Sequence, residues 1–296
     1  MTFESYLQQA LYSPSTITYY LHRLGQFTSW AKHYGTSPKT IDYKTLLHYL
    51  KHLQTNNQVQ TVNNHIATLK QYFNYLMTQG NRVDNPLEDT IIKGTIKKVY
   101  HNLLTSDELE DLYYSYNTEI FNKYTPKKQV QTIKRNKMIV GLLVYQGLNT
   151  TQLKHLRLEH LDLYKGTIYI PSTKRSNART LALKTWQVMD GIAYLNETRP
   201  ILLKNNTLEA DCLFIPQKHF NDLIHMQVLK PLKRINAKVT NVNDLRASVI
   251  VNWLKQYNIR KVQYLAGHKY ISSTERYKQD DLESLQKAVD NYHPLQ

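Results

Sequence analysis

Apolar residues recur every three or four positions along most of this chain, and this spacing constrains its fold more than any other feature. The interval matches the 3.6-residue turn of an α-helix, so most of the chain is expected to form amphipathic helices. The period changes once, over residues 167–170 and 180–183, which read as two short strands around a polar turn. The sequence therefore predicts a mainly α protein with a small β-sheet built around one hairpin.

The helical pattern is interrupted near residue 86, and the interruption divides the chain. Ser13-Pro14 and Asp42 are typical start signals for two helices, and a third helix is expected from about Thr61 to Gly80. Asn85-Pro86 then breaks the pattern. We therefore expect a helical domain over residues 1–88, a linker over 89–103, a second domain over 104–280, and a C-terminal helix or tail for protomer contact over 281–296.

The second domain is expected to be a mixed α/β domain that is mostly helix. Thr105 and Glu108 have the spacing of a capping box at the start of a helix. Ser272 and Glu275 repeat that spacing and predict a short helix that carries Tyr277. The remaining expectations are helices over about 132–146, 150–158, 186–195, 219–235 and 246–257, and a hairpin turn at Ser176-Asn177.

Positive charge is in excess along the whole chain. Lys and Arg number 38 against 23 Asp and Glu, a formal net charge of +15 with neutral His. Residues 1–100 carry 10 basic and 5 acidic side chains, and residues 101–296 carry 28 and 18. A surface-bound membrane helix would gather this charge in one segment, whereas a protein that encloses a long polyanion would spread it. The charge pattern favours a nucleic acid partner and no membrane.

Several classes of protein are excluded by what the sequence lacks. No apolar run approaches the roughly 18–20 residues that a bilayer helix needs, and no secretory signal pattern is seen. A single cysteine, Cys212, forbids an internal disulfide framework. The sequence has no glycine-rich phosphate loop, no histidine pair at metal-ligand spacing and no Gly-x-Ser-x-Gly elbow. We expect a cytoplasmic, nucleoid-associated protein that needs no metal and no cofactor.

The most informative stretch lies near the C-terminus. Arg246 precedes an apolar helical pattern, Leu265-Ala266-Gly267-His268 follows, and Tyr277 comes nine residues after the histidine. This pattern resembles the C-terminal signature of the tyrosine recombinase (phage integrase) family, in which an Arg near a helix start is followed by Leu-x-Gly-His and then a Tyr. The resemblance implies that Arg246, His268 and Tyr277 are catalytic residues.

The resemblance extends upstream over nearly the whole chain. The segment from Tyr145 to Leu158 is similar to the first active-site segment of the family, and the hairpin is similar to the β2–β3 loop that bears a catalytic lysine. Residues 1–88 resemble the SAM-like core-binding domain. The resemblance implies that Lys174 is catalytic, and that DNA is contacted by further basic residues, for which the candidates are Arg23, Lys32, Arg175 and Arg179.

The family resemblance also implies a function. A site-specific recombinase of this kind cleaves and rejoins double-stranded DNA through a 3′-phosphotyrosine intermediate. Because the covalent bond conserves the energy of the cleaved strand, religation requires no ATP and no metal. The implied partners are double-stranded DNA and further copies of the chain, as a dimer on each site and a tetramer in synapsis. A DNA-bending accessory protein is a further expected type of partner.

Some residues depart from the family pattern. The first active-site arginine would fall at Asn149, the acidic residue three positions later is Gln152, and the residue three before Arg246, usually His, is Asn243. Another cation, such as Lys154 or Arg175, is a candidate to compensate for Asn149. The residues at 292–295 resemble a mobile-element branch in which the first arginine is commonly missing.

These departures keep other functions open. The first alternative is a catalytically attenuated or inactive DNA-binding or architectural protein with the recombinase fold, consistent with Asn149 and Asn243. The second is a topoisomerase-like enzyme that nicks and seals DNA with the same chemistry but without a partner site. The third is charge-driven packaging of nucleic acid, in which case the C-terminal pattern would be a coincidence.

Overall fold

The computed structural model describes residues 1–94, 103–116, 127–204, 211–215 and 219–278 of the chain. The chain divides into two compact units, Met1–Lys98 and Val99–Gln296, and each is described by itself. The division falls within the linker expected over 89–103. The C-terminal helix or tail expected over 281–296 lies outside the described residues. Among the described residues, no helix is long and apolar enough to cross a membrane.

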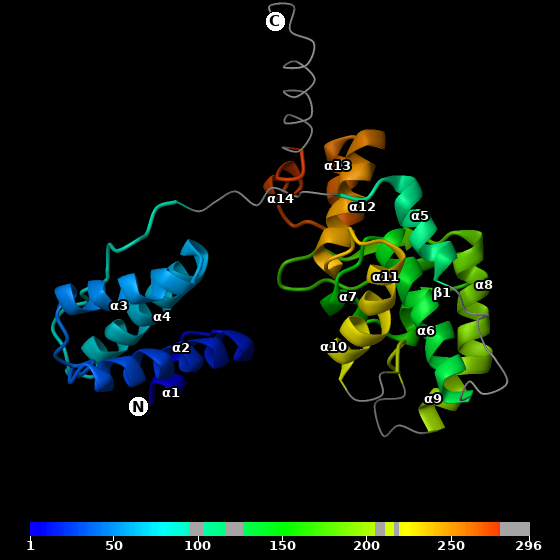
Figure 1. Ribbon diagram of the computed structural model, residues 1–296. Helices are drawn as coiled ribbons and strands as arrows, with labels where there is room; N and C mark the ends of the chain where they lie inside the picture. The colour runs from blue at the N-terminus through cyan, green and yellow to red at the C-terminus, as the bar shows by residue number, and fades with distance from the viewer. Residues whose placement is uncertain (95–102, 117–126, 205–210, 216–218, 279–296) are drawn as a thin grey trace, which may run out of the picture. The chain divides into compact units, whose positions relative to one another are not determined.

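The first unit is a bundle of four helices (Figure 1). Its helices are α1 (Phe3–Gln9), α2 (Pro14–His33), α3 (Tyr43–Asn56) and α4 (Val59–Thr78). Ser13 and Asp42 cap α2 and α3 with their side chains, as their start signals predicted. The helix expected from Thr61 begins slightly earlier, and α1 was not predicted. Buried aromatic and aliphatic side chains from α2, α3 and α4, including Phe27, Tyr49 and Phe73, form the main core.

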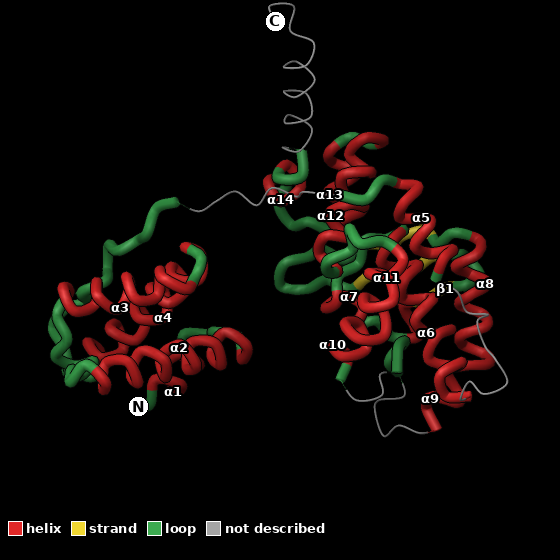
Figure 2. Tube along the Cα trace, viewed as in Figure 1, coloured by secondary structure: helices red, strands yellow, loops and turns green. Residues whose placement is uncertain are grey.

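The second unit combines helices with a small sheet, which confirms the predicted fold class (Figures 1 and 2). Its α-helices are α5 (Ser106–Ser115), α6 (Lys127–Val144), α7 (Thr150–Lys154), α8 (Thr185–Ala193), α9 (Arg199–Lys204), α10 (Phe220–Asp222), α11 (Lys230–Ile235), α12 (Val242–Gln256), α13 (Ile259–Ala266) and α14 (Ser272–Glu275). A 3-10 turn spans Leu158–His160, and π-helical segments span Tyr194–Thr198 and Leu223–Leu229. The Thr105–Glu108 capping box forms as predicted.

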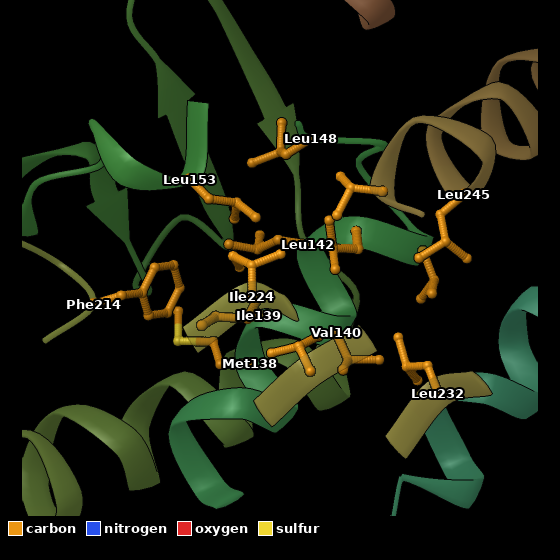
Figure 3. Close-up of a cluster of buried hydrophobic side chains, with 14 of the residues drawn as sticks. Met138, Ile139, Val140, Leu142, Leu148, Leu153, Phe214, Ile224, Leu232 and Leu245 are labelled. Atoms are coloured by element: carbon orange, nitrogen blue, oxygen red, sulfur yellow. The ribbon is translucent and has the colours of Figure 1, made fainter. Parts of the chain in front are cut away.

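Helix α6 forms the centre of this unit. Its residues from Met138 to Val144 are almost all buried, and the helix packs against α5, α8 and α12. Leu148, Leu153 and Leu245 join the same cluster from other segments (Figure 3). This C-terminal part of α6 is apolar on all sides, and such a segment is stable only when other elements surround it. The packing therefore fixes the segments on both sides of α6, including the turn at residues 145–149.

The sheet contains the strands β1 (Leu161–Asp162), β2 (Thr167–Ile170) and β3 (Arg179–Ala182) in the order β1-β2-β3. Both pairs are antiparallel, and Ile170 lies opposite Arg179 in the β2–β3 hairpin. The predicted hairpin is therefore confirmed, but its turn is not at Ser176-Asn177. The backbone amide of Thr173 donates to the carbonyl of Ser176 at 2.8 Å, so Lys174 and Arg175 form the tip.

The C-terminal helices differ in detail from the prediction. Helix α12 begins at Val242 with Asn241 as its cap, which places Arg246 in the second turn rather than at the start. Helix α13 was not predicted. The capping box expected at Ser272 does not form, because Ile271 already has helical backbone angles and Ser272 is the first residue of α14. Tyr277 lies in the turn that follows this helix rather than within it.

The segment expected to be helical over 150–158 also ends early. Helix α7 stops at Lys154, and the chain then pairs with a distant segment instead of continuing the helix. The carbonyl of Leu156 accepts from the Leu213 amide at 2.9 Å, and the Leu158 amide donates to the Asp211 carbonyl at 3.0 Å. Tertiary hydrogen bonds therefore replace those that a longer helix would have made.

Candidate active site

The C-terminal end of α13 organises the candidate site. Asn258 caps the first turn of this helix, and Gly267 ends it in the left-handed conformation, with φ of 69°. The amide of His268 then folds back to donate to the Gln263 carbonyl at 3.0 Å. Such an ending favours glycine because a side chain is strained at positive φ. The Leu-x-Gly-His motif is thus a helix terminus that presents three successive backbone carbonyls, those of Leu265, Ala266 and Gly267.

Arg246 joins this terminus to the segment after α6. Its side chain is only 8% exposed. Nη1 donates to the Gly147 carbonyl at 2.5 Å, and Nη2 donates to the Ala266 carbonyl at 2.6 Å. Both are charge-assisted hydrogen bonds, which are stronger than neutral ones. The guanidinium is therefore held in one position between two parts of the chain that are far apart in sequence.

His268 and Tyr277 lie together. Their rings are nearly parallel, with 5.8 Å between centroids and 10° between planes. The His268 Nδ1 atom forms a 2.9 Å hydrogen bond with the buried hydroxyl of Thr274, which fixes the orientation of the ring. The Tyr277 ring packs against the buried cluster formed by Ile250, Val262 and Ala266. The structure thus brings together Arg246, His268 and Tyr277, the three residues of the C-terminal motif.

Burial strongly affects the protonation of His268. Desolvation is the main cause, and the nearby Arg246 and Arg179 guanidinium groups add repulsion, so the pKa of His268 falls to about 4. The imidazole is therefore neutral at pH 7. A neutral imidazole offers one donor and one acceptor nitrogen, and which nitrogen carries the proton depends on the direction of the Thr274 hydrogen bond.

Arg179 was a candidate for contact with DNA, but the structure places its side chain in the interior. Its side chain is 3% exposed, because Arg179 occupies an inward position of β3. Nε donates to the Leu265 carbonyl at 2.7 Å, and Nη1 donates to the Ser176 hydroxyl at 3.4 Å. Burial, followed by repulsion from Arg246, lowers the pKa of Arg179 to about 9, so the group remains a cation at pH 7.

Asn149 and Gln152 have a local structural role. The Asn149 side-chain oxygen accepts from the Gln152 amide at 2.9 Å, and the Gln152 side-chain oxygen accepts from the Asn149 amide at 3.1 Å. This reciprocal pair caps the N-terminus of α7. Asn243 is exposed in the first turn of α12. Neither of the two asparagines adds a positive charge to the site.

The β2–β3 hairpin is attached to the α13 terminus at its base. Ser176 forms an isolated backbone bridge with His268, and the Asn177 amide donates to the Gly267 carbonyl at 3.0 Å. Lys174 and Arg175, at the tip, are both exposed. The hairpin base is thus fixed beside His268, whereas its two basic tip residues are free to contact a ligand.

The two candidate DNA-binding residues of the first unit do not share a face. Arg23 and Lys32 are both on α2, but a separation of nine residues is about two and a half helical turns and places them on opposite sides. Arg23 lines a cavity of about 400 Å³ together with His22, His52 and His65. Its guanidinium lies 5.6 Å from the ring centroid of Tyr19. Lys32 is exposed elsewhere on the helix.

Three residues that were not among the predicted site residues organise the site. Thr274 orients His268, Ser176 contacts both Arg179 and Gln152, and Gly147 supplies the carbonyl that binds Arg246. Only Gly147 had a signal in the sequence, since a glycine directly after a helix indicates a left-handed turn. Its φ of 57° agrees with that signal. Thr274 and Ser176 contact residues that are distant in sequence, and no local pattern predicts such contacts.

The fold and the cluster of Arg246, His268 and Tyr277 define a chain of the tyrosine recombinase type. The family models that match the chain indicate the same class. Residues 102–283 match the phage integrase family, and residues 1–80 match the phage integrase N-terminal SAM-like domain. The chain therefore belongs to the phage integrase family. The SAM-like prediction for the first domain is confirmed.

Individual relatives extend over nearly the whole chain. The tyrosine recombinase XerC of Oceanobacillus iheyensis is 26% identical over 301 residues, which cover 99% of this chain and 95% of that protein. The XerH site-specific recombinase bound to difH substrate has a TM-score of 0.67 at 19% identity, covering 92% of this chain and 78% of that one. A lambda integrase tetramer bound to a Holliday junction has a TM-score of 0.60 at 14% identity, with coverage of 94% and 75%. These structural likenesses show the fold.

Proposed function

We propose that this protein is a site-specific DNA recombinase that cleaves and rejoins strands through a 3′-phosphotyrosine on Tyr277. The observation that carries the proposal is the cluster at the end of α13, where the Tyr277 ring lies against His268 and Arg246 binds the adjoining carbonyl of Ala266. Membership of the phage integrase family supports it. So does the similarity to XerC over nearly the full chain.

In the cleavage step, Tyr277, Lys174 and His268 each have a chemical role. The Tyr277 oxygen attacks phosphorus and forms a phosphotyrosine bond while the bond from phosphorus to the 5′-oxygen breaks. The phenol proton must leave and the 5′-oxygen must gain a proton. Lys174, on the exposed hairpin tip, is our candidate general acid for the leaving oxygen. The neutral imidazole of His268, beside the phenol, is our candidate partner for the tyrosine proton or a phosphate oxygen.

The transition state places additional negative charge on the non-bridging phosphate oxygens. Fixed cations and N–H donors stabilise that charge, and they cost no reorganisation when the reaction occurs. Arg246 meets this requirement, because two hydrogen bonds hold its planar guanidinium in place before any DNA is bound. Religation reverses the same steps on a new 5′-hydroxyl, so no ATP and no metal enter the reaction.

Assembly on DNA completes the proposal. The solved lambda integrase relative is a tetramer on a Holliday junction, and the solved XerH relative is bound to its substrate DNA. We infer that this chain binds double-stranded DNA, through Arg175 and Arg23 among others, and assembles as a dimer on each site and a tetramer in synapsis. We further infer that a DNA-bending accessory protein is a partner of this assembly.

One observation favours the attenuated alternative. Asn149 is used as a helix cap and gives the site no charge, so a recombinase that relied on a cation there would cleave slowly. A suicide substrate separates the two functions, because a nicked duplex traps the covalent adduct after cleavage. We expect an adduct from the unmodified chain and none from Tyr277→Phe, with DNA affinity unchanged. DNA binding without any adduct on several duplexes from around its own gene would favour the non-catalytic function.

A second assay separates recombination from topoisomerase activity. Both reactions pass through the same adduct, but only a recombinase joins strands from two different sites. We expect two duplexes that carry the cleaved site to exchange ends when they are incubated together with the protein. Relaxation of supercoiled DNA without any exchange between sites would identify the topoisomerase-like function instead.

A further inference from the structure

We propose that Arg179 is an additional electrostatic residue of the cleavage site, which supplies the fixed positive charge that position 149 lacks. This inference rests on the proposed function and identifies a residue that completes its charge. Arg179 packs against Gly267 and does not contact DNA directly. It acts through the electrostatic field of its guanidinium and by positioning the backbone segment that leads into His268. Four observations carry the inference: its place in the site, its missing counterion, its packing on Gly267 and its link to α7.

The first observation is where Arg179 binds. Its Nε atom donates to the Leu265 carbonyl at 2.7 Å, and Nη2 of Arg246 donates to the next carbonyl, Ala266, at 2.6 Å. Two guanidinium groups therefore bind consecutive carbonyls at one helix terminus. The C-terminal end of a helix carries partial negative charge, which makes the position tolerable for cations. Arg179 is thus next to the group that we assign to the transition state.

The second observation is that Arg179 lacks a counterion. Its Nη2 atom is buried without a hydrogen-bond partner, and no ion pair with a carboxylate is found for Arg179 in the described part of the chain. Burying a charge without a partner is costly. A second cation, Arg246, increases that cost by repulsion. Such a cluster of buried positive charge gains stability when an anion binds, and the scissile phosphate is the anion that the proposed reaction brings.

The third observation concerns Gly267. A Cβ atom at this position would overlap Nη1 of Arg179 and would lie 2.8 Å from its central carbon. The guanidinium therefore packs directly against the glycine, and the backbone there leads into His268. Because no side chain separates Arg179 from this part of the site, its charge acts at short range and in a region shielded from water, where electrostatic interactions are strong.

The fourth observation links Arg179 to the position that lacks charge. Ser176 accepts from Arg179 Nη1 at 3.4 Å and from Gln152 Nε2 at 3.1 Å, and Gln152 pairs with Asn149. The guanidinium is thus connected by hydrogen bonds to the start of α7. The two cations that the sequence suggested as substitutes, Lys154 and Arg175, are both exposed and have no such connection in the described structure. Arg179 is the better assignment.

The test compares Arg179→Gln with the unmodified full-length chain on two substrates. The unmodified chain first locates the cleaved phosphate on nicked duplexes, and that phosphate is then replaced by a methylphosphonate, which lacks one negatively charged oxygen. On the ordinary phosphodiester, we expect Arg179→Gln to slow single-turnover adduct formation by about 10²-fold, the scale of losing one preorganised group. On the methylphosphonate, the two proteins should differ by no more than about threefold, since the charge that Arg179 offsets is absent.

Arg157→Gln is the matched control, because Arg157 is an exposed arginine of the same unit, near Asp211. It removes one positive charge without touching the site, and its rates should stay within about threefold of the unmodified chain on both substrates. Equal slowing of Arg179→Gln on the two substrates would mean a merely structural role and would overturn the inference. An Arg179→Gln rate equal to that of the unmodified chain would overturn it as well.

A second variant keeps the test decisive if Arg179→Gln does not fold. Arg179→Lys retains the charge but loses the planar fork, and we expect a loss of roughly tenfold on the phosphodiester and a smaller loss on the methylphosphonate. If Arg179→Lys slows adduct formation equally on the phosphodiester and on the methylphosphonate, the inference is overturned. If the unmodified chain forms no adduct while binding DNA, the proposed function fails and this inference fails with it. If that chain forms an adduct, only the Arg179 comparison is at stake.

Discussion

His268 is an imidazole enclosed by protein and flanked by two guanidinium groups, and these surroundings determine its response to pH. Its pKa falls to about 4, mainly by desolvation and then by repulsion from Arg246 and Arg179. We therefore expect an NMR titration of the DNA-free protein to show no protonation of His268 between pH 7 and pH 5. In Arg179→Gln the same pKa should rise, because one repulsive charge is gone. A His268 pKa near 6.5 in the unmodified protein would contradict this environment.

The lowered pKa of His268 also makes the free energy of unfolding depend on pH. A histidine with a lowered pKa in the folded state binds fewer protons than it does in the unfolded chain, so the free energy of unfolding rises with pH through this window. For His268 the window runs from about 4 to about 6.5. His268→Gln should therefore flatten part of the pH dependence of urea unfolding between pH 4.5 and 7. An unchanged slope in that variant would show that His268 does not contribute.

Asn149 offers a test of whether the site needs a further cation. Asn149→Arg removes a helix cap, which typically costs about 1 kcal/mol, and adds a third guanidinium near Arg246 and Arg179. If Arg179 already supplies the charge, the variant should melt at a lower temperature and cleave no faster than the unmodified protein. Asn149→Asp is the control, because it retains the cap without adding positive charge. Faster single-turnover cleavage by Asn149→Arg would contradict compensation by Arg179.

The sequence predicted the three residues of the C-terminal motif as neighbours but did not place Arg179 beside them. Arg246, His268 and Tyr277 have a fixed spacing that the family resemblance relates to one site. Arg179 instead looked like one of several basic residues on a hairpin. Its neighbour Leu181 points inward, and two-residue periodicity places Arg179 on the same inward side. That signal was present in the sequence, but nothing local indicated that the Leu265 carbonyl would bind the buried guanidinium.

At the scale of secondary-structure elements, the termination of α13 is the critical feature. Gly267→Ala should lower the melting temperature and strongly reduce adduct formation, because the alanine is strained at a φ of +69° and its Cβ would displace Arg179. Gly80→Ala is a matched control, with a φ of +68° and open space around the position. It should show only the backbone cost, roughly 1 kcal/mol, and normal cleavage. Equal effects of the two substitutions on cleavage would contradict the role of the Gly267 contact.

Helix starts were predicted well where a side chain supplies the cap within a few residues. Ser13, Asp42 and Thr105 each accept from the backbone of the following turn, and such signals are local. Helix α13 was missed because it is short, although Asn258 and Gly267 are a typical start and stop. The capping box at Ser272 was wrong because Ile271 already adopts helical angles. Local spacing alone does not reveal where the preceding loop enters a helix.

At the scale of the whole molecule, the excess of positive charge predicts how DNA binding responds to salt. The net charge of +15 is spread over both units of the chain. With about six to ten phosphate contacts, affinity should fall by roughly 10³–10⁵-fold between 50 and 200 mM salt. The measurement should use Tyr277→Phe, so that covalent trapping does not obscure the equilibrium. A flat salt response would contradict an extended DNA interface.

The central claim is that Tyr277, one of 23 tyrosines, becomes covalently joined to DNA. The most direct measurement is peptide mapping by mass spectrometry after a suicide substrate has trapped the adduct and nuclease has trimmed the DNA. We predict a nucleotide 3′-phosphate on the peptide that contains Tyr277 and no adduct from Tyr277→Phe. A nucleotide on a different tyrosine, or an adduct that survives the Tyr277→Phe substitution, would contradict the assignment.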